Sequence, residues 1–188
     1  MKTNLFSSIK LTALTLLFFS GIYTAIVWCA AQFAPNGGKG EVITANGRTF
    51  YANIGQTFTN DKYFNSRPSA VGYNAAGSGG SNKGPSNPEY LATVQARIDT
   101  FLVHNPGIEK KDIPVEMVTA SGSGLDPNIT FKSALVQVKR IASVRNVSEE
   151  SIQELIRNNT ESPLLGLFGP EKVNVLKLNI ALDNLKFN

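Results

Sequence analysis

The sequence predicts a single transmembrane helix followed by a small extracytoplasmic domain of the α/β or α+β class. Three observations predict this fold class. An uncharged apolar run covers residues 11–31, basic residues precede it, and the rest of the chain mixes strand patterns with helix patterns. Since 42% of the residues are hydrophobic, the composition is that of a folded protein rather than a disordered one.

The apolar run is long enough to cross a bilayer. As a helix rising about 1.5 Å per residue it would span about 31 Å, against roughly 30 Å for the hydrocarbon core. A cleaved signal peptide is the alternative, but its apolar core usually has about 7–15 residues and ends at small residues. Bulky residues at Ile26, Val27 and Trp28 also disfavour a lipoprotein site at Cys29. An uncleaved anchor is therefore the preferred interpretation.

The basic residues predict the direction of the anchor. Lys2, Lys10 and the free amino terminus lie before it, and positive charge beside a span is retained in the cytoplasm. We therefore predict that residues 1–10 are cytoplasmic, that residues 11–31 cross the plasma (inner) membrane, and that the domain is periplasmic or extracellular. Small residues recur on neighbouring turns, as in spans that pack closely against another helix. They are Ser20, Gly21, Thr24 and Ala25.

A glycine-rich hinge separates the anchor from the domain. It covers residues 32–40, and the predicted domain covers residues 41–188. Near the start of the domain, Asn46 and Gly47 stand between two short runs of β-forming residues. Because Asn-Gly readily adopts the positive φ angles of a two-residue turn, the sequence predicts a hairpin there.

Three helices and a terminal strand are predicted in the rest of the domain. The first helix begins behind the capping residue Asn87, the second covers residues 131–145, and the third follows the capping residue Ser148. At the end of the chain, apolar and mainly polar residues alternate over residues 176–183, which predicts a strand with one face in solvent. Strands at both ends with helices between them indicate a small layered domain.

Charge and reactive residues exclude several classes of function. Of 18 basic residues, Lys2 and Lys10 precede the apolar run, which leaves 16 against 14 acidic residues, too small an excess for nucleic-acid binding. Cys29 is the only cysteine and His104 the only histidine, so a transition-metal site and a hydrolase triad both lack the necessary residues. We predict no catalytic residue, no metal site and no cofactor bound by this chain alone.

Two long loops contain the candidate functional residues. Residues 63–88 far exceed the roughly 4–6 residues of an ordinary connection, so this segment has a task or is a flexible surface loop. A phosphate-binding loop requires Gly-Lys before Ser or Thr, whereas here Lys83 stands between Asn82 and Gly84. The weak nucleotide candidates in it are Ser78, Gly79, Gly80, Ser81 and Asn82. The second loop, residues 118–130, brings hydroxyls and Asp126 to a helix entrance, where such a carboxylate is more often structural.

Several motifs occur in an order that identifies a family. They are Ile54-Gly55-Gln56 with Phe58, residues 63–70, Tyr73-Asn74, residues 78–82, residues 84–88, residues 119–127, Gly169-Pro170 and residues 173–179. With the amino-terminal helix, the chain resembles over nearly its whole length the C subunit of the Kdp-type potassium-transporting ATPase of bacteria and archaea. Lys83 is the main departure, because an apolar residue is expected there. The resemblance marks as interaction candidates Arg67, Pro68, Ser69, Asn74, Ser121, Ser123 and Asp126.

The resemblance implies a membrane complex that imports potassium at the expense of ATP and uses magnesium. Its other members would be a channel-like potassium-binding subunit and a P-type ATP-hydrolysing subunit, since this chain lacks an Asp-Lys-Thr-Gly motif and one helix forms no selectivity filter. The family's C subunit is described as needed for assembly and as a catalytic chaperone that raises the pump's affinity for ATP. The predicted topology puts the first long loop, residues 63–88, on the opposite side of the membrane from cytoplasmic ATP. It therefore favours the assembly role, with the chaperone role as the alternative.

Overall fold

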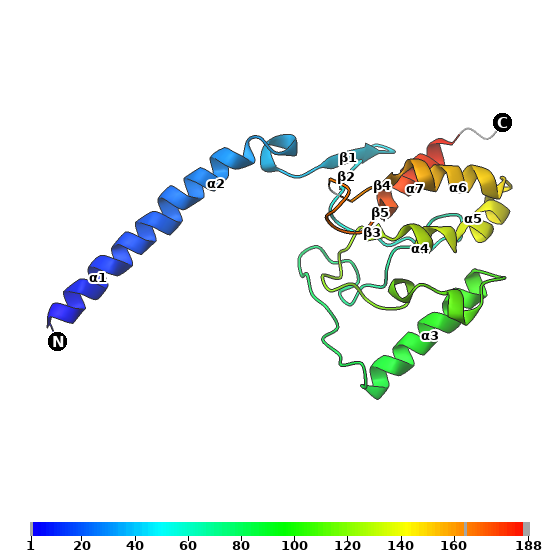
Figure 1. Cartoon of the computed structure of the whole chain (residues 1–188), viewed down its shortest axis with the longest axis horizontal. Helices are drawn as coiled ribbons and strands as arrows, with labels where there is room; N and C mark the ends of the chain where they lie inside the picture. The colour runs from blue at the N-terminus through cyan, green and yellow to red at the C-terminus, as the bar shows by residue number, and fades with distance from the viewer. Residues whose placement is uncertain (1, 164, 186–188) are drawn as a thin grey trace.

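A long apolar helix leads the chain. The structure, a computed structural model, describes residues 2–163 and 165–185; Met1 of the predicted cytoplasmic segment and residues 186–188 of the predicted domain lie outside this description. The helix comprises α1 (Lys2–Leu16), the π-helical segment η1 (Leu17–Tyr23) and α2 (Thr24–Ala31). Figure 1 shows it projecting away from the rest of the protein.

The length and exposure of this helix suit a membrane span. The candidate span covers Asn4–Ala31, 28 residues, and the protein buries none of its most apolar stretch. The hydroxyl of Thr24 donates to the carbonyl of Phe19, five residues earlier, at 2.9 Å, so this polar group is satisfied inside the helix. Because hydrocarbon offers no hydrogen-bond partners, such internal pairing is required there. The predicted single apolar helix is thus present, and as a helix it begins before residue 11.

The hinge and the predicted hairpin follow. A short 3₁₀ turn, η2 (Pro35–Gly38), precedes β1 (Val42–Ala45) and β2 (Arg48–Tyr51), which pair antiparallel with Ala45 opposite Arg48. Asn46 and Gly47 have φ angles of 50° and 72°. The hairpin predicted from this dipeptide is confirmed.

The predicted helices are present, with one interruption. They are α3 (Pro88–His104), α4 (Phe131–Leu135), α5 (Val138–Arg145) and α6 (Glu149–Asn158), with the short turns η3 (Lys110–Asp112) and η4 (Val115–Met117) between α3 and α4. Asn87 and Ser148 cap α3 and α6 as predicted, each accepting a hydrogen bond from an amide of the first turn. The prediction of one continuous helix over residues 131–145 is wrong, because the helix breaks at Val136 and Gln137.

The terminal strand prediction is also wrong. A three-stranded antiparallel sheet forms in the order β3 (Asn128–Ile129), β5 (Lys172–Asn174), β4 (Thr160–Glu161), and the chain then enters α7 (Val175–Asn184). Asn174 caps this helix by accepting from the amide of Lys177 at 3.1 Å. The buried positions Val175, Leu178, Asn179 and Leu182 have helical spacing. Asn179 is polar but buried, and it stands between Leu178 and Ile180. The segment therefore seemed to alternate between apolar and polar residues, although its buried positions have the helical period.

One hydrophobic core joins the sheet and the helices. Figure 1 shows α4, α5, α6 and α7 gathered on one side of the domain and α3 along the other. The least exposed large side chains of this core belong to α5, α6, α7, the sheet and one loop residue, Phe64: they are Phe64, Ile129, Ile141, Ile152, Ile156, Val173, Leu178 and Leu182. A loop that contributes a fully buried phenylalanine has a fixed path through the domain.

Candidate functional site

The two loops singled out from the sequence lie against each other. We call residues 66–82 and 119–127 the paired loops. Besides the pairing of Arg67 with Asp126, four hydrogen bonds join them: Ser121 N to Pro68 O at 3.2 Å, Ser69 Oγ to Gly124 O at 2.7 Å, Gly79 N to Ser123 O at 2.8 Å and Ser78 Oγ to Ser123 O at 3.0 Å. The paired loops therefore form one polar unit from segments some fifty residues apart, although neither is a regular strand.

An ion pair closes the same unit. Arg67 Nη1 donates to Asp126 Oδ2 at 3.1 Å, and the two side chains are 23% and 29% exposed. The other carboxylate oxygen of Asp126 accepts from the amide of Asn128 at 3.0 Å, so the residue also fixes the entry into β3. Within the described residues, Arg67 Nε is buried without a hydrogen-bond partner. Arg67 and Asp126, two of the interaction candidates, pair with each other and stabilise the fold.

Tyr73 lies inside the same unit. Its hydroxyl donates to the carbonyl of Arg67, and its amide donates to Ser69 Oγ at 2.9 Å. Burial raises the pKa of the Tyr73 phenol, the nearby Asp126 carboxylate raises it further, and a hydrogen bond with Ser66 partly opposes both. The phenol therefore stays protonated at neutral pH and acts as a hydrogen-bond donor rather than as a base.

Glycine is required where the paired loops touch. Gly124 has a φ of 68°, and a Cβ built on it would lie 2.6 Å from Val71 Cγ2 and 2.8 Å from the carbonyl of Gly79. At Gly55, which leads into the first loop, a Cβ would lie 2.6 Å from the carbonyl of Asp126. Since real Cβ atoms do not approach other atoms this closely, only glycine allows these backbones to meet.

Two of the weak nucleotide candidates are already bonded to the second loop. Two of their donors, the hydroxyl of Ser78 and the amide of Gly79, are bonded to Ser123 O, and Gly80 approaches the second loop closely. Ser81 is exposed and lines a cleft of about 400 Å³ that Lys83 also borders. Asn82 has a positive φ of 52°. Asn74 lies within the first of the paired loops, where its side chain accepts from the amide of Ala76 in its own turn.

Two buried side-chain amides hold the segment that leads into the first loop. Asn179 Oδ1 accepts from the amide of Phe64 at 2.8 Å, and its Nδ2 donates to the carbonyl of Phe64 at 3.0 Å. Gln137 does the same for Asn65, at 2.8 Å and 3.3 Å. Both backbone groups of two successive residues are thus satisfied without a strand. The break between α4 and α5 falls at Gln137, where this contact is made.

Arg140 joins this segment to the rest of the domain. Its side chain is only 2% exposed and donates to Asn65 Oδ1, Gln137 Oε1, Asn105 Oδ1 and the carbonyls of Asp61 and Tyr63. Burial lowers the pKa of Arg140 to about 10, with the Asp61 carboxylate partly opposing, so the guanidinium stays charged at neutral pH. This residue organises five acceptors, and it was not among the residues singled out from the sequence.

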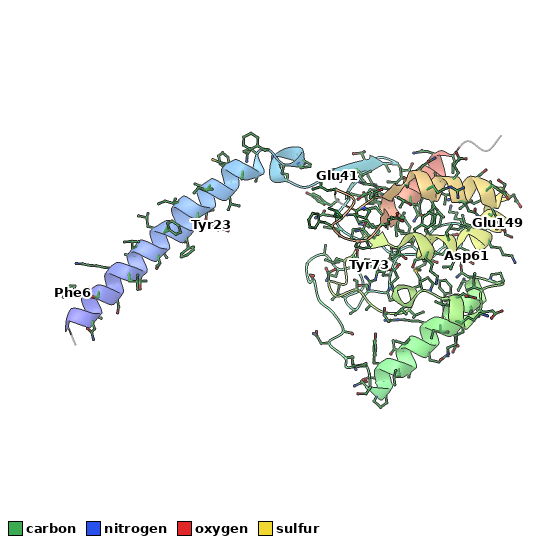
Figure 2. The ribbon with its side chains drawn as sticks, viewed as in Figure 1. Phe6, Tyr23, Glu41, Asp61, Tyr73 and Glu149 are labelled. Atoms are coloured by element: carbon green, nitrogen blue, oxygen red, sulfur yellow. The ribbon has the colours of Figure 1, made fainter. Side chains whose placement is uncertain are left out.

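His104 is one of the residues that line a cleft between α3 and the segment before the first of the paired loops. The cleft has a volume of about 600 Å³ and separates α3 from residues 59–65. His104 Nδ1 lies 2.9 Å from Asp61 Oδ1, and both side chains are nearly half exposed. Figure 2 shows Asp61 on the opposite side of the domain from Tyr73, so this pair is separate from the paired loops. The described residues contain no group of three or more His, Cys, Asp or Glu side chains able to hold a metal ion.

Comparison with known proteins identifies the family. The family model for KdpC, the c chain of the K⁺-transporting ATPase, matches residues 5–184. This chain belongs to the KdpC family. It is 58% identical to the potassium-transporting ATPase KdpC subunit of Bacteroides fragilis, and the match covers 99% of each chain. The KdpC subunits of Flavobacterium psychrophilum and Geobacter sulfurreducens are 56% and 46% identical, over 97% and 94% of this chain and 99% and 97% of the relatives.

Membership of the KdpC family confirms the resemblance found in the sequence. The chain is a subunit of a potassium-transporting ATPase, and its single amino-terminal apolar helix is consistent with association with the membrane. In this KdpC-family chain the paired loops and the buried amides join distant segments of the domain by hydrogen bonds.

Proposed function

We propose that this chain is an accessory subunit that neither conducts ions nor catalyses a reaction by itself. Its helix docks against a channel-like potassium-binding subunit, and its domain caps that subunit on the periplasmic or extracellular side. The arrangement stabilises the assembly of the channel-like subunit with a P-type ATP-hydrolysing subunit. ATP, magnesium and potassium are used by the complex, and this chain binds none of them independently.

The observation that carries this proposal is the uncovered helix. Over Asn4–Ala31 the most apolar stretch has no part buried by the chain's own domain. Such a surface requires lipid or another protein, and small residues at Ser20, Gly21, Thr24 and Ala25 let a second helix approach closely. Lys2 and Lys10 before the span support a cytoplasmic amino terminus and a domain on the outer side.

The domain supports a capping role through its rigidity. The paired loops are joined by backbone and side-chain hydrogen bonds and by the ion pair of Arg67 with Asp126. The side chains of Gln137, Arg140 and Asn179 form hydrogen bonds with Phe64 and Asn65, just before the first of the paired loops. A rigid surface loses little conformational entropy on docking, which favours a stable complex.

A span exchange tests the proposal. Residues 11–31 are replaced by a polyleucine span of the same length, with Lys2 and Lys10 retained, so that anchoring and direction are kept while the packing surface is lost. We expect the channel-like subunit to stop co-purifying with this variant. The matched control replaces only Leu11, Leu14 and Leu17 by isoleucine and should co-purify normally. Full co-purification of the polyleucine variant would show that the helix does not dock.

A second function has one observation in its favour. The cleft of about 400 Å³ beside Ser81 is bordered by Lys83 and Arg97, and two cationic residues suit a phosphate group. In this alternative the chain raises the ATP affinity of the pump subunit through residues 78–82. It requires the domain to lie in the cytoplasm, because ATP is there. The positive charge of Lys83 is already paired with Glu89, which disfavours this function.

A further inference from the structure

The connection between β4 and β5 exposes large apolar side chains. We call residues 162–170 the apolar loop; its sequence, Ser-Pro-Leu-Leu-Gly-Leu-Phe-Gly-Pro, contains no charge. Leu165 is 80% exposed, Leu167 81% and Phe168 63%. Single exposed apolar residues are ordinary, whereas three within four positions of an uncharged loop mark a surface that contacts something other than water.

The backbone of the apolar loop fixes this exposure. The amide of Gly166 donates to the carbonyl of Pro163 at 2.9 Å and closes a turn. Gly166 and Gly169 have φ angles of 72° and 86°, and Leu165 itself has a φ of 56°. A leucine in the left-handed region is uncommon. The turn therefore holds the side chains of Leu165, Leu167 and Phe168 outward rather than against the core.

Ion pairs tie the base of the apolar loop to the entrance of the domain. Lys172 Nζ lies 3.3 Å from Glu161 Oε2, across the two ends of the loop. Lys177 Nζ lies 2.9 Å from Glu41 Oε1 and 3.7 Å from Glu161 Oε1. Glu41 is the first residue after the hinge, so the apolar loop leaves the domain at the corner where the chain arrives from the helix. Figure 2 shows Glu41 at this corner, on the side facing the helix.

The hinge keeps this corner close to the end of the helix. Gly38 packs on the last residue of α2, since a Cβ built on it would lie 2.8 Å from the Cβ of Ala31. Only Lys39 and Gly40 stand between Gly38 and Glu41, and these three Cα–Cα steps reach at most about 11 Å. The end of the helix lies at the membrane surface if the helix crosses the bilayer. The base of the apolar loop is therefore held next to that surface.

We propose that the apolar loop inserts into the lipid interface beside the span and acts as a second membrane anchor. Moving leucine and phenylalanine side chains from water to the boundary between headgroups and acyl chains lowers the free energy. Glu161 and Lys172 at the base of the loop pair with each other, and Glu171 stands beside Lys172, so these charges mark the depth at which the chain stays at headgroup level. Two points of attachment fix the tilt of the domain more firmly than one. This inference depends on the span but on no partner subunit.

Fluorescence quenching in vesicles tests the second anchor. The full chain with Trp28→Phe and Phe168→Trp is reconstituted into phosphatidylethanolamine and phosphatidylglycerol vesicles, with part of the lipid brominated near the headgroup end of its acyl chains. We expect a blue-shifted emission maximum, loss of emission with brominated lipid, and protection from aqueous iodide. The matched control carries Val103→Trp instead. Val103 is 78% exposed, near the end of α3, which Figure 1 shows on the far side of the domain from the helix. Its reporter should be quenched by iodide and not by the lipid.

Two results would overturn the inference. Iodide quenching of the F168W reporter equal to that of V103W would mean that the loop stays in water. Protection of the F168W reporter from both quenchers in the purified transport complex would mean that a protein subunit covers the loop instead of lipid.

Discussion

Replacing Asn179 by leucine removes the amide that holds Phe64. The backbone N–H and C=O of Phe64, bonded to Asn179 at 2.8 Å and 3.0 Å, then lose their partner while buried. Each unsatisfied buried group costs about 1–3 kcal/mol, which gives roughly 2–6 kcal/mol for the two. The added apolar surface offsets about 1–2 kcal/mol of this. Taking the middle of each range, the free energy of unfolding should fall by about 2.5 kcal/mol, a large part of the roughly 5–15 kcal/mol of an ordinary domain.

Pulse proteolysis in urea measures this loss on the full chain in detergent, because the protease cuts only unfolded domain. With a urea dependence of roughly 2 kcal/mol per molar, N179L should lower the midpoint by about 0.5–2 M. The matched control is Asn184→Leu, an exposed position on the same helix, which should change stability by less than about 0.5 kcal/mol. Equal midpoints for N179L and N184L would refute the role of the buried amide.

Three further substitutions probe other parts of the domain. Arg140→Met leaves five acceptors without their donor and should destabilise the domain by about 3–5 kcal/mol in the same assay, whereas the exposed Arg157→Met should have little effect. Gly124→Ala places a Cβ 2.6 Å from Val71 and should separate the paired loops, which would appear as faster protease cleavage within residues 66–82. The control Gly122→Ala, where an added Cβ meets no atom within 4 Å, should leave the cleavage rate unchanged. Equal cleavage rates for the two variants would contradict the close contact at Gly124. His104→Ala should leave potassium transport unchanged, because the His104–Asp61 pair is exposed and separate from the paired loops; loss of transport with normal assembly would revive a role for this histidine as a base.

Local signals predicted much of the fold. The Asn-Gly turn at Asn46 and the capping residues Asn87 and Ser148 act through contacts with their sequence neighbours, so the sequence alone is sufficient to place them. The apolar helix is equally local, since its length and lack of charge are properties of one segment. Each of these predictions is confirmed by the structure.

The errors arose where a polar residue is buried for a distant partner. Asn179 occupies an inward position of α7 because its side chain accepts a hydrogen bond from the backbone of Phe64, 115 positions earlier. A polar residue at this buried position made the helical pattern look like the alternation of a strand. Gln137 interrupts the helix predicted over residues 131–145 at the point where it binds Asn65. Both stand between apolar residues, a pattern that flags buried polar groups, but the identity of the partner is a property of the tertiary fold. The pairing of Arg67 with Asp126 likewise depends on the contact between the two loops, which is a property of the tertiary fold.

The side of the membrane on which the domain lies tests the proposed function most directly. Ser81 is exposed, and Cys29, the only native cysteine, is removed by Cys29→Ser, so Ser81→Cys gives a single reporter on the domain. The proposal predicts that a membrane-impermeant maleimide labels this reporter in whole cells, once any outer membrane has been made permeable. Protection in such cells, relieved when the inner membrane is lysed, would put the domain in the cytoplasm and contradict an outer cap in favour of the ATP-affinity role.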